Sequence, residues 1–202
     1  MNINNLDKIY KFTELENNTS TIKETQEEGE CIYKVNFDDD FIRIYTENSE
    51  FERAKEMFQL EILRKKCDGI IITNTKLILI ELKTTFNINS FIKALNQLLS
   101  SYVKVKIFFG KFEDLEKIDI EFIIASKIVN NFDKYEISKQ EKILSNKGIL
   151  GDYFWILLNE REITLKEKFP FPHKDIVNDK EVLNILKPFI INNLKISLKE
   201  CE

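Results

Sequence analysis

The stretch CDGIIITNTKLILIELKT, residues 67–84, carries charge at particular places within two aliphatic runs. Asp68 precedes the first run, and Glu81 and Lys83 close the second. Long apolar runs of this kind are typical of buried strands. Burying a charge costs several kcal/mol unless the charge is paired or bound to a metal. The three charged side chains therefore need a partner or a ligand.

The two runs most simply form a β-hairpin, because Asn74 and Thr75 make the polar break between them. A symmetrical loop at this break places Asp68 directly opposite Glu81, and cross-strand partners have Cβ atoms about 4.5–5.5 Å apart. Lys83 lies two residues beyond Glu81 and therefore on the same face of the hairpin. The sequence thus predicts that two carboxylates and an ammonium converge at one end of a buried hairpin.

Two adjacent carboxylates repel each other unless a proton or a cation lies between them. Oxygen ligands in a small cluster suit Mg²⁺ or Mn²⁺, and an adjacent Lys can hold a metal-activated water and offset charge in a transition state. The alternative is a salt bridge between Lys83 and Glu81, with Asp68 at the end of a strand. The spacing alone leaves both interpretations open.

The spacing of Asp68, twelve further residues and the acidic-x-Lys triplet Glu81–Lys83 resembles the motif of the PD-(D/E)XK nuclease superfamily. The next segment, ALNQL, contains Gln97 and is similar to the Ala-x-x-Gln-Leu feature of many members. KKCDGII is similar to the start of the motif strand in some members, with Cys67 in place of the Pro that names the motif. The resemblance covers roughly residues 50–110.

The resemblance implies a metal site with an attacking water. Asp68 and Glu81 would ligate Mg²⁺ or Mn²⁺, with the backbone carbonyl of Leu82 as a further ligand. Lys83 would position the nucleophilic water. Gln97 would hold the nucleic-acid backbone near the cut or support Lys83.

Members of the superfamily often add a Glu from the first helix. Glu61 is the candidate metal ligand here, because it falls on the inward face of the helix that the capping box Ser49-x-x-Glu52 predicts. If residues 58–64 form a strand instead, the helical acid is Glu52 or Glu56.

We expect an α/β (α+β) fold with a restriction-endonuclease-like core, a central mixed β-sheet flanked by helices. The chain is expected to be a single domain over 1–202. The nuclease-like core would cover about 50–126, with lineage-specific elaborations at 1–49 and 127–202.

Local patterns predict the other elements. Helices are expected in the first part of 1–30, from 49 onward, and over 87–102, 138–148 and 178–199. Strands are expected on both sides of an acidic turn at 38–40, over 103–109 and 120–126, and as a pair at 152–158 and 161–167.

Four further features have plainer interpretations than a functional one. His173 is expected in a surface loop rather than in catalysis, and Asp38–Asp40 in a turn rather than a calcium loop. The aromatic run around Trp155 is expected in the core rather than stacked on bases. Lys104 and Lys106 are expected on a solvated strand face.

Composition sets the broad class. The chain is 43% hydrophobic and 32% charged, which is typical of an ordered globular protein. The formal charge of -4 excludes a polybasic nucleic-acid coat. The three cysteines show no CxxC spacing, so we expect no disulfide framework and a reducing compartment. No apolar run reaches the ~20 residues of a membrane span, and the polar start MNINNLDKIYKF is unlike a signal peptide. We expect a cytoplasmic protein without membrane contact.

We expect a metal-dependent endonuclease that hydrolyses phosphodiester bonds, with DNA favoured over RNA as the substrate. Its expected role is in restriction or in defence against phages or plasmids. The alternatives are a catalytically inactive nuclease-fold protein that binds nucleic acid or protein, and a ribonuclease on the same scaffold. The intact Asp68, Glu81 and Lys83 set favours the enzyme. The mildly acidic charge favours the binding protein, or else a homodimer or an activating partner that supplies affinity.

Overall fold

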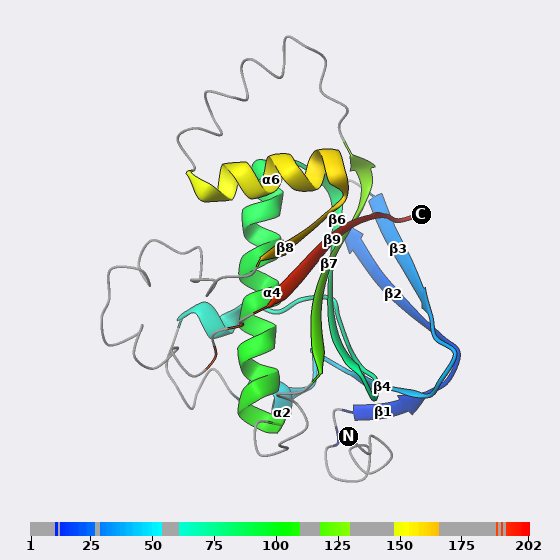
Figure 1. Cartoon of the computed structure of the whole chain (residues 1–202). Helices are drawn as coiled ribbons and strands as arrows, with labels where there is room; N and C mark the ends of the chain where they lie inside the picture. Colours follow the sequence, from blue (N-terminus) through cyan, green and yellow to red (C-terminus); the bar gives the residue numbers. More distant parts are fainter. Residues whose placement is uncertain are drawn as a thin grey trace.

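The structure is a computed structural model that describes residues 11, 13–26, 29–53, 61–109, 118–129, 148–165, 189, 191 and 193–202. Figure 1 shows its elements. The strands are β1 (Thr13–Glu16), β2 (Thr19–Gln26), β3 (Gly29–Asn36), β4 (Phe41–Ile44), β5 (Gly69–Ile72), β6 (Lys76–Phe86), β7 (Asp119–Val129), β8 (Glu162–Leu165) and β9 (Leu194–Glu200). The helices are α2 (Ser49–Glu52), the 3₁₀ turn η2 (Glu61–Arg64), α4 (Ile88–Phe109) and α6 (Ile149–Glu160).

A seven-stranded mixed sheet organises these elements, with the strand order β1-β4-β5-β6-β7-β9-β8. The strands from β1 to β6 pair antiparallel, β6 pairs parallel with β7, and β7 pairs parallel with β9. The expected α/β class with a mixed sheet flanked by helices is confirmed. Strands from the segments before residue 50 and after residue 126 belong to this same sheet.

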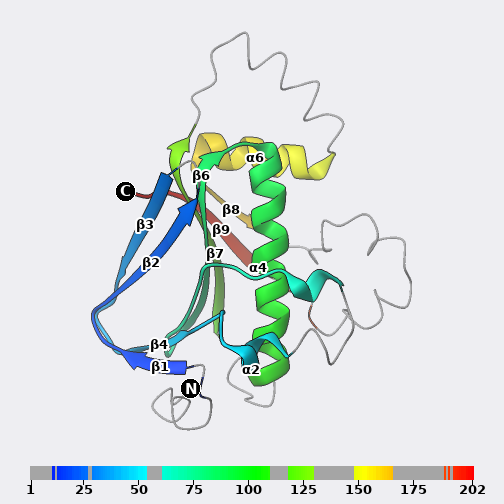
Figure 2. The ribbon, with the colours of Figure 1, turned by 180° about the vertical axis from the view of Figure 1, so that it is seen from behind.

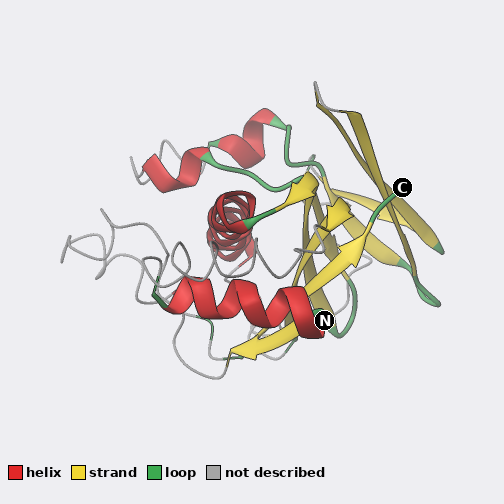
Figure 3. Ribbon diagram, turned by 90° about the horizontal axis from the view of Figure 1, so that it is seen from above, coloured by secondary structure: helices red, strands yellow, loops and turns green. Residues whose placement is uncertain are grey.

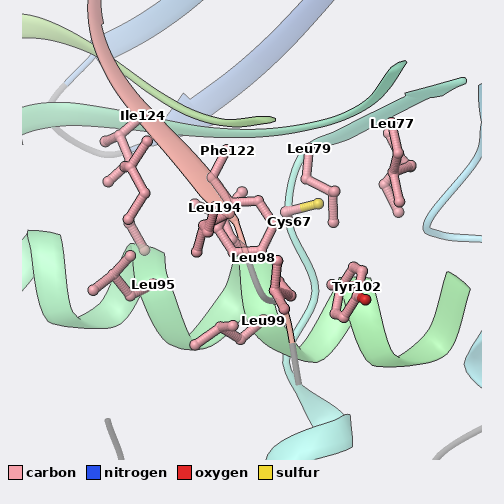
Figure 4. Packing of buried hydrophobic residues seen from close by; sticks show 14 of the residues in the cluster. Cys67, Leu77, Leu79, Leu95, Leu98, Leu99, Tyr102, Phe122, Ile124 and Leu194 are labelled. Carbon is pink, nitrogen blue, oxygen red and sulfur yellow. The ribbon is translucent and has the colours of Figure 1, made fainter. Parts of the chain in front are cut away.

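The helix α4 makes the crossover between the parallel strands β6 and β7 and covers one face of the sheet (Figure 1). Asn87 caps its start, because its side-chain oxygen accepts from the backbone N–H groups of Asn89 and Ser90, each at 3.0 Å. The larger core lies between α4 and the sheet, and Figure 4 shows part of it. The labelled side chains there are Cys67, Leu77, Leu79, Leu95, Leu98, Leu99, Tyr102, Phe122, Ile124 and Leu194.

The hairpin β2–β3 covers the opposite face, so the sheet lies between this hairpin and α4 (Figures 2 and 3). A second, smaller core fills this side, and it includes Ile22 of β2 and Ile80 and Leu82 of β6. The hairpin approaches closely at Gly69, where an added Cβ would lie 2.6 Å from Cδ1 of Ile22. A side chain at residue 69 would therefore force the Ile22 side chain to shift.

The end of the chain ties the hairpin to the sheet. Ile32 and Glu202 exchange two backbone hydrogen bonds of 3.1 and 3.0 Å, and Cys31 forms a disulfide with Cys201. One disulfide is therefore present, although the cysteine spacing predicted no disulfide framework and a reducing compartment. The two cysteines are 170 residues apart in sequence, and only the placement of β3 beside the end of β9 brings them together.

The hairpin at residues 67–84 has the predicted register. Gly69 pairs with Ile80 and Ile72 with Leu77, the symmetrical arrangement expected for a loop centred on Asn74 and Thr75. The strand expected over 120–126 is also confirmed, within β7.

The strand predicted over 103–109 is wrong, because these residues continue α4. The alternation of Val and Lys suggested a strand with one wet face, but Lys104 is fully buried. Its ammonium lies 3.0 Å from Oε1 of Glu52 and over the ring of Phe51. Burial lowers the pKa of Lys104, and the bond to Glu52 opposes this. Glu52, a partly exposed partner on α2 that is far away in sequence, thus replaces the expected solvent.

The predicted strand over 152–158 is also wrong, because it lies in α6. The core face of this helix carries Gly151, Phe154 and Leu157 at a spacing of three residues. Phe154 stacks on Phe86 with a ring-centroid distance of 5.0 Å, so the aromatic run does belong to the core, as expected.

The C-terminal expectations are partly wrong. Within 161–167 the strand β8 is present, but its partner is β9 rather than residues 152–158. The last part of the helix predicted over 178–199 is the strand β9. Residues 138–147 and 178–188 lie outside the described residues.

The N-terminal expectations also need correction. Residues 1–10, where the helix expected in the first part of 1–30 would begin, lie outside the described residues, and β1 and β2 lie within 13–26. Strands do lie on both sides of Asp38–Asp40, but β3 pairs with β2 while β4 pairs with β1 and β5. The helix α2 does begin at Ser49, but its cap is Asn48, whose side chain accepts from Glu50 N.

Substitution Gly69→Ala should lower the free energy of unfolding by about 1–3 kcal/mol, because the new methyl group overlaps Ile22. Ile22→Val removes Cδ1, the atom that would clash, so the double variant should be more stable than the sum of the two single effects. Denaturant unfolding of the four proteins measures this coupling. Additive effects would contradict the packing of the hairpin over β5.

Substitution Lys104→Met should destabilise the protein by up to about 3–5 kcal/mol, because it removes one partner of a buried ion pair. The double change Lys104→Met and Glu52→Gln should recover much of this loss. Lys106→Met, two residues further along α4, serves as the control, with an expected change within about 0.5 kcal/mol. Equal effects of the two Lys substitutions in thermal or denaturant unfolding would contradict the buried position of Lys104.

Candidate functional site

The site lies where the β5–β6 hairpin meets α4. Side chains alternate along β6, so Leu77 and Leu79 face α4 while Ile78 and Ile80 face the hairpin β2–β3. Continuing this alternation places residues 81 and 83 on the α4 face. The strand β6 therefore places a carboxylate and an ammonium in the apolar layer between the sheet and α4.

The Lys83 ammonium connects the strand to the helix. It donates to Oε1 of Glu81 and, at 3.3 Å, to Oε1 of Gln97 on α4. Glu81 is fully buried, and Lys83 is mostly buried. The structure thus brings together the three residues of β6 and α4 that the sequence singled out.

Asp68 immediately precedes β5 and lies beside Leu82. Its Oδ2 accepts from the backbone N–H of Leu82 at 2.6 Å, and its own N–H donates to the carbonyl of Ile80 at 3.0 Å. The N–H and C=O of a strand residue point to the same side, so the Leu82 carbonyl also points toward Asp68. The Leu82 carbonyl, which the resemblance offers as a metal ligand, therefore faces the same side of β6 as the Leu82 N–H that binds Asp68.

A row of polar side chains on α4 holds the backbone that leads into Asp68. Gln97 Nε2 donates to the carbonyl of Lys66 at 3.0 Å, and Ser100 Oγ donates to the carbonyl of Lys65 at 2.7 Å. Ser101 Oγ accepts from Cys67 N at 2.8 Å. The sequence analysis missed both serines, although polar residues three and four positions after Gln97 on an apolar helix face were a usable signal.

The two carboxyl groups of the site are poorly compensated. Burial raises the pKa of Asp68 from 3.8 to about 6, against the opposing hydrogen bond from Leu82 N. Burial and the charge of Asp68 also raise the pKa of Glu81, and Lys83 opposes this. The second oxygen of Glu81, Oε2, is buried and has no hydrogen-bond partner among the described residues. Asp68 is close enough for its charge to raise the pKa of Glu81, and two neighbouring carboxylates repel each other unless a proton or a cation lies between them.

The oxygen donors of the site suit a small, hard cation that keeps several of its own waters. Among the described residues, no three His, Cys, Asp or Glu side chains are arranged to hold a metal ion. The donors present are two carboxylates, Asp68 and Glu81, and the carbonyl of Leu82. Mg²⁺ is commonly held by one or two carboxylates and keeps several of its waters, so this donor set suits Mg²⁺ or Mn²⁺.

The acid expected from the first helix has a different outcome. Glu52 forms the ion pair with Lys104 described above. Glu56 lies outside the described residues, and so does the side chain of Glu61, whose backbone belongs to η2. His173 is also outside the described part of the chain.

A different acid, Glu24 on β2, acts on the site. Its charge is among the causes that raise the pKa of both Asp68 and Glu81. Its Oε2 is buried without a hydrogen-bond partner. The sequence analysis missed Glu24 because it expected no strand in this segment, and the inward side of a strand becomes visible only once its pairing is known.

Nothing matches this chain in comparisons with protein-family models, with curated protein sequences and with solved structures. Within the described part of the chain, the helices are too short or too polar to span a lipid bilayer. The fold and the site define an α/β protein with a buried glutamate, a partly buried aspartate and a lysine at the open end of a central hairpin.

Substitution Asp68→Asn should stabilise the metal-free protein near pH 7.5 by about 1–3 kcal/mol and change it little near pH 4. The raised pKa means that the folded protein binds more protons than the unfolded chain between pH 3.8 and about 6. The free energy of unfolding of the wild type therefore falls as the pH rises through this range, and Asn removes that fall.

Denaturant unfolding across this pH range, in buffers with EDTA, measures the effect. Asp38→Asn, at an exposed position, is the control. A loss of stability at pH 7.5 in Asp68→Asn would show that the Asp68 carboxylate is well compensated without a cation.

Proposed function

We propose that this protein is a metal-dependent endonuclease of the PD-(D/E)XK type that hydrolyses phosphodiester bonds, with DNA as the expected substrate. The observation that carries the proposal is the contact of the Lys83 ammonium with both Glu81 and Gln97. It lies beside a buried Glu81 oxygen that has no hydrogen-bond partner among the described residues. A lysine placed this way beside two carboxyl groups combines a cation site with a group that can orient water.

The order of elements around the site supports the restriction-endonuclease-like core. The turn η2, the hairpin β5–β6, the helix α4 and the parallel strand β7 follow one another in this order among the described elements. The residues that carry the resemblance to the superfamily motif lie just before β5 (Asp68), on β6 (Glu81–Lys83) and on α4 (Gln97).

Asp68, Glu81 and the carbonyl of Leu82 would hold Mg²⁺ or Mn²⁺. The bound ion would supply an acidified water and neutralise charge on the phosphate. Lys83 would orient the attacking water and offset the charge that develops on the phosphate. Gln97 positions Lys83 through its Oε1 and fixes the chain before Asp68 through its Nε2.

A basic run precedes the site and suits a polyanionic substrate. Arg64 and Lys65 are exposed and Lys66 is half-buried, while α4 holds the backbone carbonyls of Lys65 and Lys66. Basic side chains on a fixed backbone beside the carboxyl pair can contact phosphates. This local patch reconciles a nucleic-acid substrate with a net charge of -4. A homodimer or an activating protein could add further affinity, and a cytoplasmic role in restriction or defence is part of the proposal.

The second candidate is a catalytically inactive protein of the same fold that binds nucleic acid or protein. The ion pair between Lys83 and Glu81 favours it, because this contact satisfies the lysine without any metal. A ribonuclease on the same scaffold remains the alternative enzyme. Cleavage assays on duplex DNA, single-stranded DNA and RNA, each with Mg²⁺, Mn²⁺ or EDTA, separate the three.

Substitutions Lys83→Ala and Glu81→Ala should each reduce metal-dependent cleavage by about 10²–10⁴-fold. Glu81→Ala should also weaken Mn²⁺ binding, because it removes a ligand. Lys83→Ala should bind Mn²⁺ as well as the wild type or better, because it removes a positive charge beside the ion.

Calorimetric Mn²⁺ titration and cleavage kinetics on the same preparations measure both effects. Lys76→Ala is the control, because Lys76 is the first residue of β6, at the end of the strand away from the site, where it forms an ion pair with Glu121. Cleavage by Lys83→Ala at the wild-type rate would make Lys83 a salt-bridge partner only and overturn the mechanism. A wild-type protein that cleaves none of the three substrates would favour the binding protein.

A further inference from the structure

The inward face of β2 leads to the site from the side opposite α4. Ser20 and Ile22 are buried and Glu24 is half-buried, while the residues between them are exposed. Ile22 lies against Gly69, the residue that follows Asp68. Glu24 is two residues further along the same face, a displacement of about 6.6 Å along a strand.

Glu24 is held in place more firmly than a surface acid. It pairs with Cys31 across the β2–β3 hairpin, and Cys31 is joined to Cys201 by the disulfide. The next residue, Ile32, exchanges backbone hydrogen bonds with Glu202. The residues that follow β9 therefore anchor the hairpin at Cys31, which lies directly across the hairpin from Glu24.

The charges around the site remain unbalanced when Glu24 is included. Glu24, Asp68 and Glu81 are three carboxyl groups, and the Lys83 ammonium is engaged with Glu81. Within the described part of the chain, one buried oxygen of Glu24 and one of Glu81 have no hydrogen-bond partner, and the Glu81 side chain is 0% exposed. An unpartnered buried carboxylate oxygen is costly, and a hydrated cation at this point would satisfy both acids.

We propose that Glu24 is a positioning residue of the cation site, which accepts a hydrogen bond from a water on the ion that Asp68 and Glu81 hold. This inference rests on the proposed function for the ion, and it assigns to the N-terminal hairpin the acid that the resemblance would place on the first helix. We place a water between Glu24 and the ion because β2 packs on the face of the sheet opposite α4, whereas Glu81 lies on the α4 face. A cation such as Mg²⁺ keeps waters that can make this bridge.

The test is a calorimetric Mn²⁺ titration of the full-length chain as wild type, Glu24→Gln and Glu30→Gln. Glu30 lies on the outer face of the same hairpin, where it pairs with Lys23, so its substitution removes the same charge away from the site. Glu24→Gln should weaken Mn²⁺ binding by about 10–100-fold, the usual effect of losing a group that supports a metal ligand. Glu30→Gln should bind as the wild type does.

The outcomes separate this inference from the nuclease proposal. Wild-type Mn²⁺ affinity in Glu24→Gln overturns the role of Glu24, and equal losses in Glu24→Gln and Glu30→Gln reduce it to a general charge effect and also overturn it. A wild-type protein that binds Mn²⁺ but cleaves no nucleic acid would remove the nuclease proposal and leave this one standing. A wild-type protein that does not bind Mn²⁺ overturns both.

Circular dichroism first checks that Glu24→Gln is folded. If it does not fold, Glu24→Asp decides the question, because it keeps the charge and shortens the reach of the carboxylate. A loss of Mn²⁺ affinity in Glu24→Asp then supports the proposal, and unchanged affinity overturns it.

Discussion

The burial of the Glu81 carboxyl on a central strand is the constraint around which the rest of the site is arranged. This side chain is fully buried, and the residues of β6 directly before it, 77–80, are all aliphatic. A charge in such a position must be paired, protonated or bound to a cation. Lys83 satisfies one oxygen, Asp68 lies beside the carboxyl group, and the other oxygen has no partner in the described structure. The arrangement is half-compensated, which is typical of a site that receives a ligand.

The helix α4 makes this arrangement rigid. One side of the helix supplies the apolar residues of the larger core. Within the same face, Gln97, Ser100 and Ser101 bind backbone groups of the segment before Asp68. The helix α4 thus fixes both the packing around the site and the path of the chain that leads into Asp68. Precise support of this kind is what a catalytic or metal site requires.

The other face of the sheet adds a constraint from distant parts of the chain. The hairpin β2–β3 packs on β6 through Ile22 and its neighbours, and the C-terminal residues fasten it by the disulfide and by backbone pairing. The site therefore lies between a helix that is close in sequence and a hairpin that is not. Glu24 is the residue by which the second of these elements acts on the carboxyl pair.

The sequence by itself determined the features that depend on neighbours along the chain. The hairpin at residues 67–84 could be predicted because strands alternate every second residue and a short loop fixes their register. Asp68, Glu81 and Lys83 follow from that register. Tertiary structure decided what depends on distant partners: Lys104 is buried in a helix because Glu52 pairs with it, and 152–158 is a helix because its aromatic face packs on the core. The Cys31–Cys201 disulfide and the approach of Glu24 likewise arise from contacts between distant segments, which a local pattern does not encode.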